Sequence, residues 1–192
     1  EEEHVVGTLS RYHLLRPRRK QVVLMDHNEM AQAVDGLDQA EILEIIDHHR
    51  IGSLETGGPV YFRNEPVGCT ATIVWRMYGE QNITPPKPIA GLLLSAILSD
   101  TLLFRSPTST PLDEAAAKAL AAIAEVDIPA YAEQMFESGA DLTGRTAEDV
   151  FFSDFKVFSR GDVKFGVGQS SYMTPRTRAA AEALVGPYLP EA

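Results

Sequence analysis

Carboxylate and imidazole side chains follow apolar runs at three places in this sequence. Asp26 follows the run Val-Val-Leu-Met, and Asp100 follows a longer run rich in leucine. The triplet Asp47-His48-His49 ends the run Glu-Ile-Leu-Glu-Ile-Ile. Carboxylate and imidazole together suit a borderline divalent ion such as Mn²⁺, Co²⁺ or Zn²⁺ better than Ca²⁺. The pattern therefore predicts a metal site with positions left open for water and a phosphate oxygen.

The strands expected around these groups explain how they could meet. VVLMD (22–26) and EILEIID (41–47) have the continuous apolar, β-branched character of buried strands, and GPVYFRNEPVG (58–68) is a third extended segment. In a parallel sheet, ligands bind beyond the carboxyl ends of the strands. We therefore expect the acid at the end of the first strand and the triplet at the end of the second to lie on one edge.

Helical patterns alternate with these strands. Strands that alternate with helices predict an α/β layered domain with a largely parallel sheet. Near the end of the chain, an SRGD turn is expected to join two strands. At the start, a short apolar strand is expected to run into a polar turn. The expected segments are a strand and turn at 5–15, a short helix in 28–34, helices at 69–81, 87–104, 110–126, 129–139 and 177–186, and two strands within 155–172.

Composition limits the kinds of function that the chain can have. With 192 residues, it can bury one sizeable core, or one core and part of another. The net charge of −10 argues against a broad basic face for nucleic acid. A polyanionic substrate would therefore need a local source of positive charge, such as a metal ion. The single cysteine, Cys69, cannot form an internal disulfide, and no segment resembles a membrane span. We expect a cytoplasmic protein that does not bind membranes.

Each candidate ligand also has a simpler explanation. A single Asp after a strand is more often a turn former or a helix N-cap than a metal ligand. A single His is usually a partly buried hydrogen-bonding residue, and Asp100 could simply cap the next turn. What favours a site is that acids and imidazoles recur at the ends of several apolar elements.

Five blocks of sequence, in order, also carry a resemblance to a known family. The blocks are VVLMDHNE, EIIDHHRIG, RNEPVGCTATIV, LLLSAILSDTLLFRSPTST and DFKVF, between Val22 and Ser170. They resemble the family II, manganese-dependent inorganic pyrophosphatases of the DHH phosphoesterase superfamily. The resemblance implies a homodimeric enzyme that hydrolyses pyrophosphate to two phosphates. It also implies Mn²⁺ or Co²⁺ in the site, with Mg²⁺ arriving with the substrate.

The resemblance assigns a role to individual side chains. Asp26 would bridge two metal ions, and His48 and Asp100 would complete the site of the second ion. His49 would face the substrate phosphate. Lys156, in the last block, would bind the phosphate that is attacked.

The sequence also departs from the family's pattern. The Arg63-Asn64 pair resembles a substrate-binding loop, but no His-x3-Asp-x-Asp pattern stands before Asp26 and no Ser-Arg-Lys-Lys motif follows the last block. These motifs would supply further metal ligands and the cations of a second domain. We therefore expect the chain to be a middle portion of such an enzyme and, in isolation, to be nearly inactive.

The segment VVGTLSRYHLL, ahead of these blocks, resembles the last strand-to-helix turn of a CBS nucleotide-binding module. Gly7, Ser10, Arg11 and His13 occupy its pattern, with His13 where an Asp is usual. The resemblance implies that Ser10, Arg11 and His13 bind an adenine nucleotide that regulates the longer protein. An edge strand followed by a turn would explain the same residues without a ligand.

These resemblances predict a division of the chain, and they leave two other functions open. A DHH nuclease or phosphatase would act on short oligonucleotides or nucleoside bisphosphates, although the chain has no glycine-rich GGGH-like stretch of the kind used by that subgroup. A non-catalytic metal- or nucleotide-binding module is the other alternative. The expected parts are the tail of a CBS module (1–16), a linker (17–21), a DHH catalytic domain without its first motif (22–170) and the start of a C-terminal DHHA2-type domain (171–192).

Overall fold

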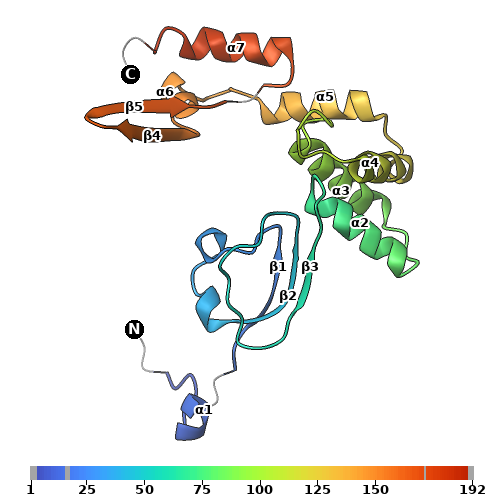
Figure 1. Ribbon diagram of the computed structural model, residues 1–192, viewed down its shortest axis with the longest axis vertical. Helices are drawn as coiled ribbons and strands as arrows, with labels where there is room; N and C mark the ends of the chain where they lie inside the picture. The colour runs from blue at the N-terminus through green and yellow to red at the C-terminus, as the bar shows by residue number, and fades with distance from the viewer. Residues whose placement is uncertain (1–3, 16–17, 171, 190–192) are drawn as a thin grey trace.

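The computed structural model describes residues 4–15, 18–170 and 172–189. The expected boundaries at residues 16, 17 and 171 lie outside this description. The structure has a three-stranded sheet, a group of helices and a separate hairpin (Figure 1). The elements are α1 (Arg11–Leu15), β1 (Gln21–Met25), β2 (Glu41–Asp47), β3 (Tyr61–Asn64), α2 (Thr70–Glu80), α3 (Lys87–Asp100), α4 (Pro111–Ala124), α5 (Ile128–Gly139), α6 (Ala147–Phe151), β4 (Phe155–Arg160), β5 (Val163–Gly168) and α7 (Pro175–Val185), with short 3₁₀ turns η1 (Met30–Gln32) and η2 (Leu37–Gln39).

The sheet is parallel and has the strand order β1-β2-β3. Met25 pairs with Ile46, and Asp47 pairs with Asn64, so all three strands end at one edge. The backbone N–H of Asp26 donates to the carbonyl of Ile46 (2.9 Å), which continues the pairing one residue beyond β1. The predicted α/β fold with a parallel sheet is confirmed.

The main core lies among α2, α3, α4 and α5. Four side chains of α3 are fully buried, as its apolar sequence predicts: Ala90, Leu94, Ile97 and Leu98. The helix ends at Asp100, four residues before the end of the predicted segment. The three residues from 102 to 104 have positive φ (49°, 54° and 64°), so the chain turns with the opposite hand after Thr101, the residue that caps the helix.

Helix α4 begins where its sequence predicts. Pro111 occupies its first turn, and Thr110 and Asp113 form a capping box. In this arrangement the Thr110 hydroxyl and backbone N–H both donate to the Asp113 carboxylate (2.7 and 2.8 Å). A second capping box, between Thr146 and Asp149, begins the short helix α6, which the sequence analysis did not predict.

Two predictions at the start of the chain were wrong. The strand expected within residues 5–15 does not form, and the segment instead contains helix α1. Val5 and Val6 are 91% and 100% exposed, and the structure describes no neighbouring strand whose backbone groups could pair with theirs. The helix expected within 28–34 is only the single 3₁₀ turn η1.

The prediction that the first strand is buried was also wrong in part. Leu24 packs with Leu37 and Ile45, but Val23 and Met25 on the opposite face of β1 are exposed. A parallel sheet is buried on both faces only where helices cover both. The described residues cover one face of β1.

The C-terminal part consists of the β4–β5 hairpin with α6 and α7. The hairpin is antiparallel, with Phe158 opposite Phe165, as the sequence predicts. In Figure 1 this part lies away from the three-stranded sheet, and α5 leads from the helices toward it. None of the helices described is long and apolar enough to cross a membrane.

Candidate metal centre

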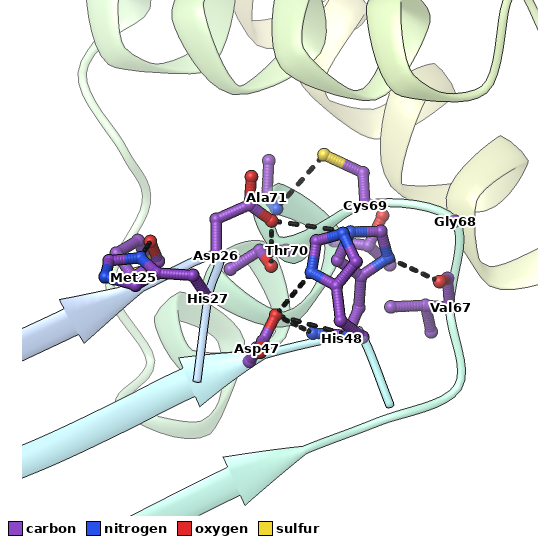
Figure 2. Close-up of polar contacts among 12 residues, drawn as sticks. Met25, Asp26, His27, Asp47, His48, Val67, Gly68, Cys69, Thr70 and Ala71 are labelled. Carbon is purple, nitrogen blue, oxygen red and sulfur yellow. Dashed lines mark hydrogen bonds and ion pairs between the residues drawn. The ribbon is translucent and has the colours of Figure 1, made fainter. Parts of the chain in front are cut away.

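Asp26 directly follows β1, at the edge of the sheet where the strands end. Its φ of 68° is in the left-handed region, which Asp tolerates better than most residues. The Thr70 hydroxyl, at the start of α2, donates to Oδ1 of Asp26 (2.7 Å). Figure 2 shows the Asp26 carboxylate between Thr70 and the His48 ring. Its side chain is half exposed, so it can still bind a ligand.

His48 is held in the orientation of a metal ligand. Its Nδ1 lies 2.9 Å from the carbonyl oxygen of Val67. Because a carbonyl oxygen can only accept, Nδ1 carries the proton and Nε2 of the neutral ring carries a lone pair. Nε2 lies 3.4 Å from Oδ1 of Asp26, and the side chain is only 12% exposed. This is the arrangement in which metal-binding histidines are usually found.

His49 is oriented by its neighbour Asp47. Nδ1 of His49 donates to Oδ1 of Asp47 (2.8 Å), which leaves Nε2 available to a ligand. Asp47 is fully buried and also accepts the backbone N–H groups of His48 and His49. Burial acts to raise the pKa of Asp47, but the hydrogen bonds that it accepts outweigh burial and lower it. Within the triplet, the acid therefore orients and the two histidines face the site.

Asn28 is a site residue that the sequence analysis missed. Its buried amide donates to Oδ2 of Asp47 and to the carbonyl of Arg50 (3.0 Å), and it accepts from the backbone N–H of Gly52. A Cβ at Gly52 would clash with the Glu29 side chain and lie 3.1 Å from the carbonyl oxygen of Asn28, so a larger residue there would require the neighbouring loop to shift. The pattern DHNE followed by HHRIG contains both residues, but their contact depends on the sheet.

Three of the predicted residues converge. One ligand atom each from Asp26, His48 and His49 lies within 4.8 Å of the others, and no other group of this kind occurs among the residues described. A pocket of ≈ 410 Å³ is lined by both histidines and Arg50. One carboxylate and two imidazole nitrogens are donors that suit Mn²⁺, Co²⁺ or Zn²⁺.

Asp100 lies nearby but does not join this cluster. It is the exposed last residue of α3, and its carboxylate interacts with the thiol of Cys69. Burial raises the pKa of Cys69, and the hydrogen bond with Asp100 raises it further. Cys69 caps α2 and directly precedes Thr70, the partner of Asp26. Asp100 is thus beside the loop that supports the site.

Arg63 and Asn64 lie at the same sheet edge, at the end of β3. The amide of Asn64 donates to the carbonyl of His49 (2.8 Å). The guanidinium of Arg63 makes a bidentate pair with Glu80 (2.6 and 2.7 Å) and a further bond to Glu65 (2.7 Å). The hydrogen bonds to Glu80 and Glu65 raise the pKa of Arg63. In this structure Arg63 is engaged by acids of its own chain.

Lys156 is not brought to the sheet edge. It lies on β4 and is 71% exposed, with Nζ 3.5 Å from Asp154. The hairpin that carries it lies away from the sheet in Figure 1. Its predicted role as a phosphate ligand stays a prediction.

Ser10, Arg11 and His13 are exposed at the start of the chain. The backbone N–H of Ser10 donates to Nδ1 of His13 (3.1 Å), and the Ser10 hydroxyl is 3.2 Å from the same atom. Arg11 begins helix α1. Their predicted role in nucleotide binding likewise stays a prediction.

Comparison with known proteins finds matches to two families. The DHH family, N-terminal domain, matches residues 4–97, and the DHHA2 domain matches residues 133–185. A cobalt-dependent inorganic pyrophosphatase of Clostridium perfringens is 49% identical over 173 residues, which are 90% of this chain and 32% of that protein. A protein of Clostridium acetobutylicum named "Probable manganese-dependent inorganic pyrophosphatase" is 53% identical over 152 residues, 79% of this chain and 49% of that protein.

A solved structure is also similar. It is the crystal structure of a Methanococcus jannaschii protein proposed to be a family II inorganic pyrophosphatase, with a TM-score of 0.68 and 35% identity. The match covers 90% of this chain and 59% of that one, so the chain spans only part of each of these proteins. Residues 4–97 are thus similar to the DHH family, N-terminal domain, and residues 133–185 to the DHHA2 domain, and most of the chain is similar to part of these inorganic pyrophosphatases.

Proposed function

We propose that the chain forms part of the active site of a metal-dependent enzyme that hydrolyses pyrophosphate to two phosphates. The observation that carries this proposal is the convergence of Asp26, His48 and His49 at the sheet edge, with ligand atoms within 4.8 Å of one another. The names of the manganese- and cobalt-dependent relatives support it. Because the chain spans only part of these relatives, we assign the activity to the longer protein.

The residues at the edge fit a transition ion. Asp26 and His48 would hold Mn²⁺ or Co²⁺, and Asp100 would complete the ligand set. A divalent ion there supplies positive charge and Lewis acidity toward water and phosphate oxygens. In a chain with a net charge of −10, such charge is what a pyrophosphate anion requires.

Three side chains would act on the substrate itself. His49, fixed through Nδ1 by Asp47, would offer Nε2 to a phosphate oxygen. Lys156 would bring a cation to the phosphate that is attacked, and Asn64 would line the site. Arg63 would approach substrate only by leaving its partners Glu80 and Glu65, so its predicted contact with substrate stays a prediction. Mg²⁺ would arrive with pyrophosphate as its counter-ion.

We also propose that an adenine nucleotide regulates the longer protein, with Ser10, Arg11 and His13 at its site. The support is the pattern at residues 5–15. We further propose that the longer protein is a homodimeric, cytoplasmic enzyme that does not bind nucleic acid. The net negative charge of the chain agrees with the absence of nucleic-acid binding.

Metal binding tests the site directly. We expect the chain to bind Mn²⁺ in a titration followed by electron paramagnetic resonance, and its melting temperature to rise. A ligand at a hundredfold excess over its Kd stabilises a fold by about 2.7 kcal/mol. His48→Ala should abolish both effects. His27→Ala is the matched control, because His27 follows Asp26 but its Nδ1 bonds to the carbonyl of Met25 and it does not join the cluster.

Two results would contradict the assignment. One is a wild-type chain that binds no Mn²⁺ or Co²⁺, and the other is a His48→Ala variant that binds as well as the wild type. For the longer protein, phosphate release should be fast from pyrophosphate and absent from short oligonucleotides. The reverse preference would favour the nuclease alternative.

A further inference from the structure

Asp113 is a buried carboxylate that lies outside the predicted site. It stands in the first turn of α4 and is fully buried. Its Oδ1 accepts the Thr72 hydroxyl (2.6 Å), and its Oδ2 accepts the Thr110 hydroxyl and N–H and the backbone N–H of Gly68 (2.8 Å). A capping box accounts for the bonds with Thr110 but not for those with Gly68 and Thr72.

The bond to Gly68 connects Asp113 with the site through a single peptide group. The N–H of Gly68 belongs to the same peptide as the carbonyl of Val67, and that carbonyl accepts from Nδ1 of His48 (2.9 Å). Because a trans peptide is planar, its N–H and C=O point in opposite directions. The carboxylate therefore holds one end of this peptide and the imidazole binds the other. Hydrogen bonds in such a series polarise one another.

The local sequence is adapted to this contact. A Cβ at Gly68 would lie 2.8 Å from Oδ2 of Asp113 and 2.8 Å from Cγ2 of Thr101. Only glycine therefore lets the carboxylate reach the backbone N–H. Val67, Gly68 and Asp113 are all buried, so water does not compete for these bonds.

We propose that Asp113 is a positioning residue for His48 and acts through the Val67–Gly68 peptide. It keeps the Val67 carbonyl aimed at Nδ1, which keeps Nε2 unprotonated and facing Asp26. Metal-binding histidines usually donate their second nitrogen to a carboxylate or a carbonyl, and here a carboxylate lies one peptide beyond the carbonyl. The consequence for metal affinity rests on the proposed function, whereas the effect on the His48 tautomer does not.

The tautomer can be measured in the metal-free chain. Long-range ¹H–¹⁵N spectra of the histidine rings, recorded where the rings are neutral, should show Nδ1 of His48 protonated. Asp113→Ala should shift the population toward Nε2–H, and Asp113→Asn, which keeps a neutral acceptor, should give an intermediate result. Asp149→Asn is the matched control: Asp149 has the same capping-box position in α6, with Thr146 as its partner. It should leave the His48 signals unchanged.

Mn²⁺ titrations provide the second readout. We expect Asp113→Ala to weaken Mn²⁺ binding by about 10- to 100-fold, as is typical when an outer partner of a metal ligand is removed. A wild-type chain without Mn²⁺ affinity would contradict the proposed function, and the spectra would still decide the role of Asp113. A folded Asp113→Ala variant with the wild-type His48 spectrum would overturn the inference. If circular dichroism shows that Asp113→Ala does not fold, the His48 spectra of Asp113→Asn and Gly68→Ala test the inference instead. Unchanged His48 signals in both of these variants would overturn the inference.

Discussion

At the scale of single residues, each side chain that faces the candidate metal centre is held by a partner behind it. Thr70 holds Asp26, the Val67 carbonyl holds His48, and Asp47 holds His49. Such partners restrict the ligand side chains before any ion binds, so less entropy is lost on binding. The site is thus largely formed by the protein itself.

The buried carboxylate of Asp113 makes stability depend on pH. Burial acts to raise its pKa, but the hydrogen bonds from Thr72, Thr110 and Gly68 outweigh burial and lower it. A group with a lowered pKa in the folded state stabilises the fold fully above its unfolded value, about 3.9, and this contribution is lost as pH falls through the folded value.

We therefore expect Asp113→Asn to lower the free energy of unfolding by about 2–4 kcal/mol at neutral pH, since a buried anion with four donors is replaced. The difference from the wild type should shrink below about pH 4. Urea unfolding followed by circular dichroism at several pH values measures this. Asp149→Asn, at an exposed capping box, should show a much smaller effect. A difference that does not change with pH would contradict the assignment.

At the scale of elements, α3 forms the centre of the core and ends beside the site. Leu94 is fully buried against the other helices, whereas Leu92 on the same helix is 66% exposed. Helix α3 carries Asp100 as its last residue, so loosening the helix should also loosen that carboxylate.

Leu94→Ala should destabilise the chain by about 2–5 kcal/mol, because it removes buried methyl groups and leaves a cavity. Leu92→Ala, the same change on the exposed face of the helix, should cost less than about 0.5 kcal/mol. Thermal and urea unfolding of the two variants compare these costs. Equal costs would mean that α3 packs through a different face.

At the scale of the whole molecule, the candidate phosphate ligands lie in two separate parts. The metal cluster is at the edge of the three-stranded sheet, and Lys156 is on a hairpin that lies away from it (Figure 1). The chain also spans only part of its relatives. Under the proposed function, the two parts would have to approach one another, and the longer protein would supply further groups.

The isolated chain should therefore release phosphate from pyrophosphate far more slowly than the longer protein. Loss of one preorganised donor typically lowers the rate by about 10²–10³, and groups that act as a unit are not additive. In the longer protein, Lys156→Ala should lower turnover by a similar factor. Lys164→Ala, on the exposed neighbouring strand β5, is the control and should have little effect. Full turnover by the isolated chain, or by Lys156→Ala, would mean that the site is misplaced.

Local sequence patterns predicted much of this protein. The apolar runs predicted β1, β2 and the helices α2 to α5, and the acids and imidazoles that follow the strands predicted the sheet edge as a site. The predictions of these strands and helices succeed because side-chain periodicity is a property of short segments, whereas the function of the sheet edge as a site stays a prediction. The strand expected around Val5 failed, because a strand forms only when another strand pairs with it.

Only the tertiary structure decided which side chains face the candidate metal centre and which of them orient their neighbours. Nothing in the order of residues shows that Asp47 points inward while His48 and His49 face the pocket, or that Asn28 bridges two loops. The same is true of Asp113, which lies 45 residues from Gly68 in sequence and meets it through a buried hydrogen bond. Such contacts depend on how helices pack against the loops at the sheet edge. They arise from many weak interactions distributed over the whole chain, and no short pattern encodes them.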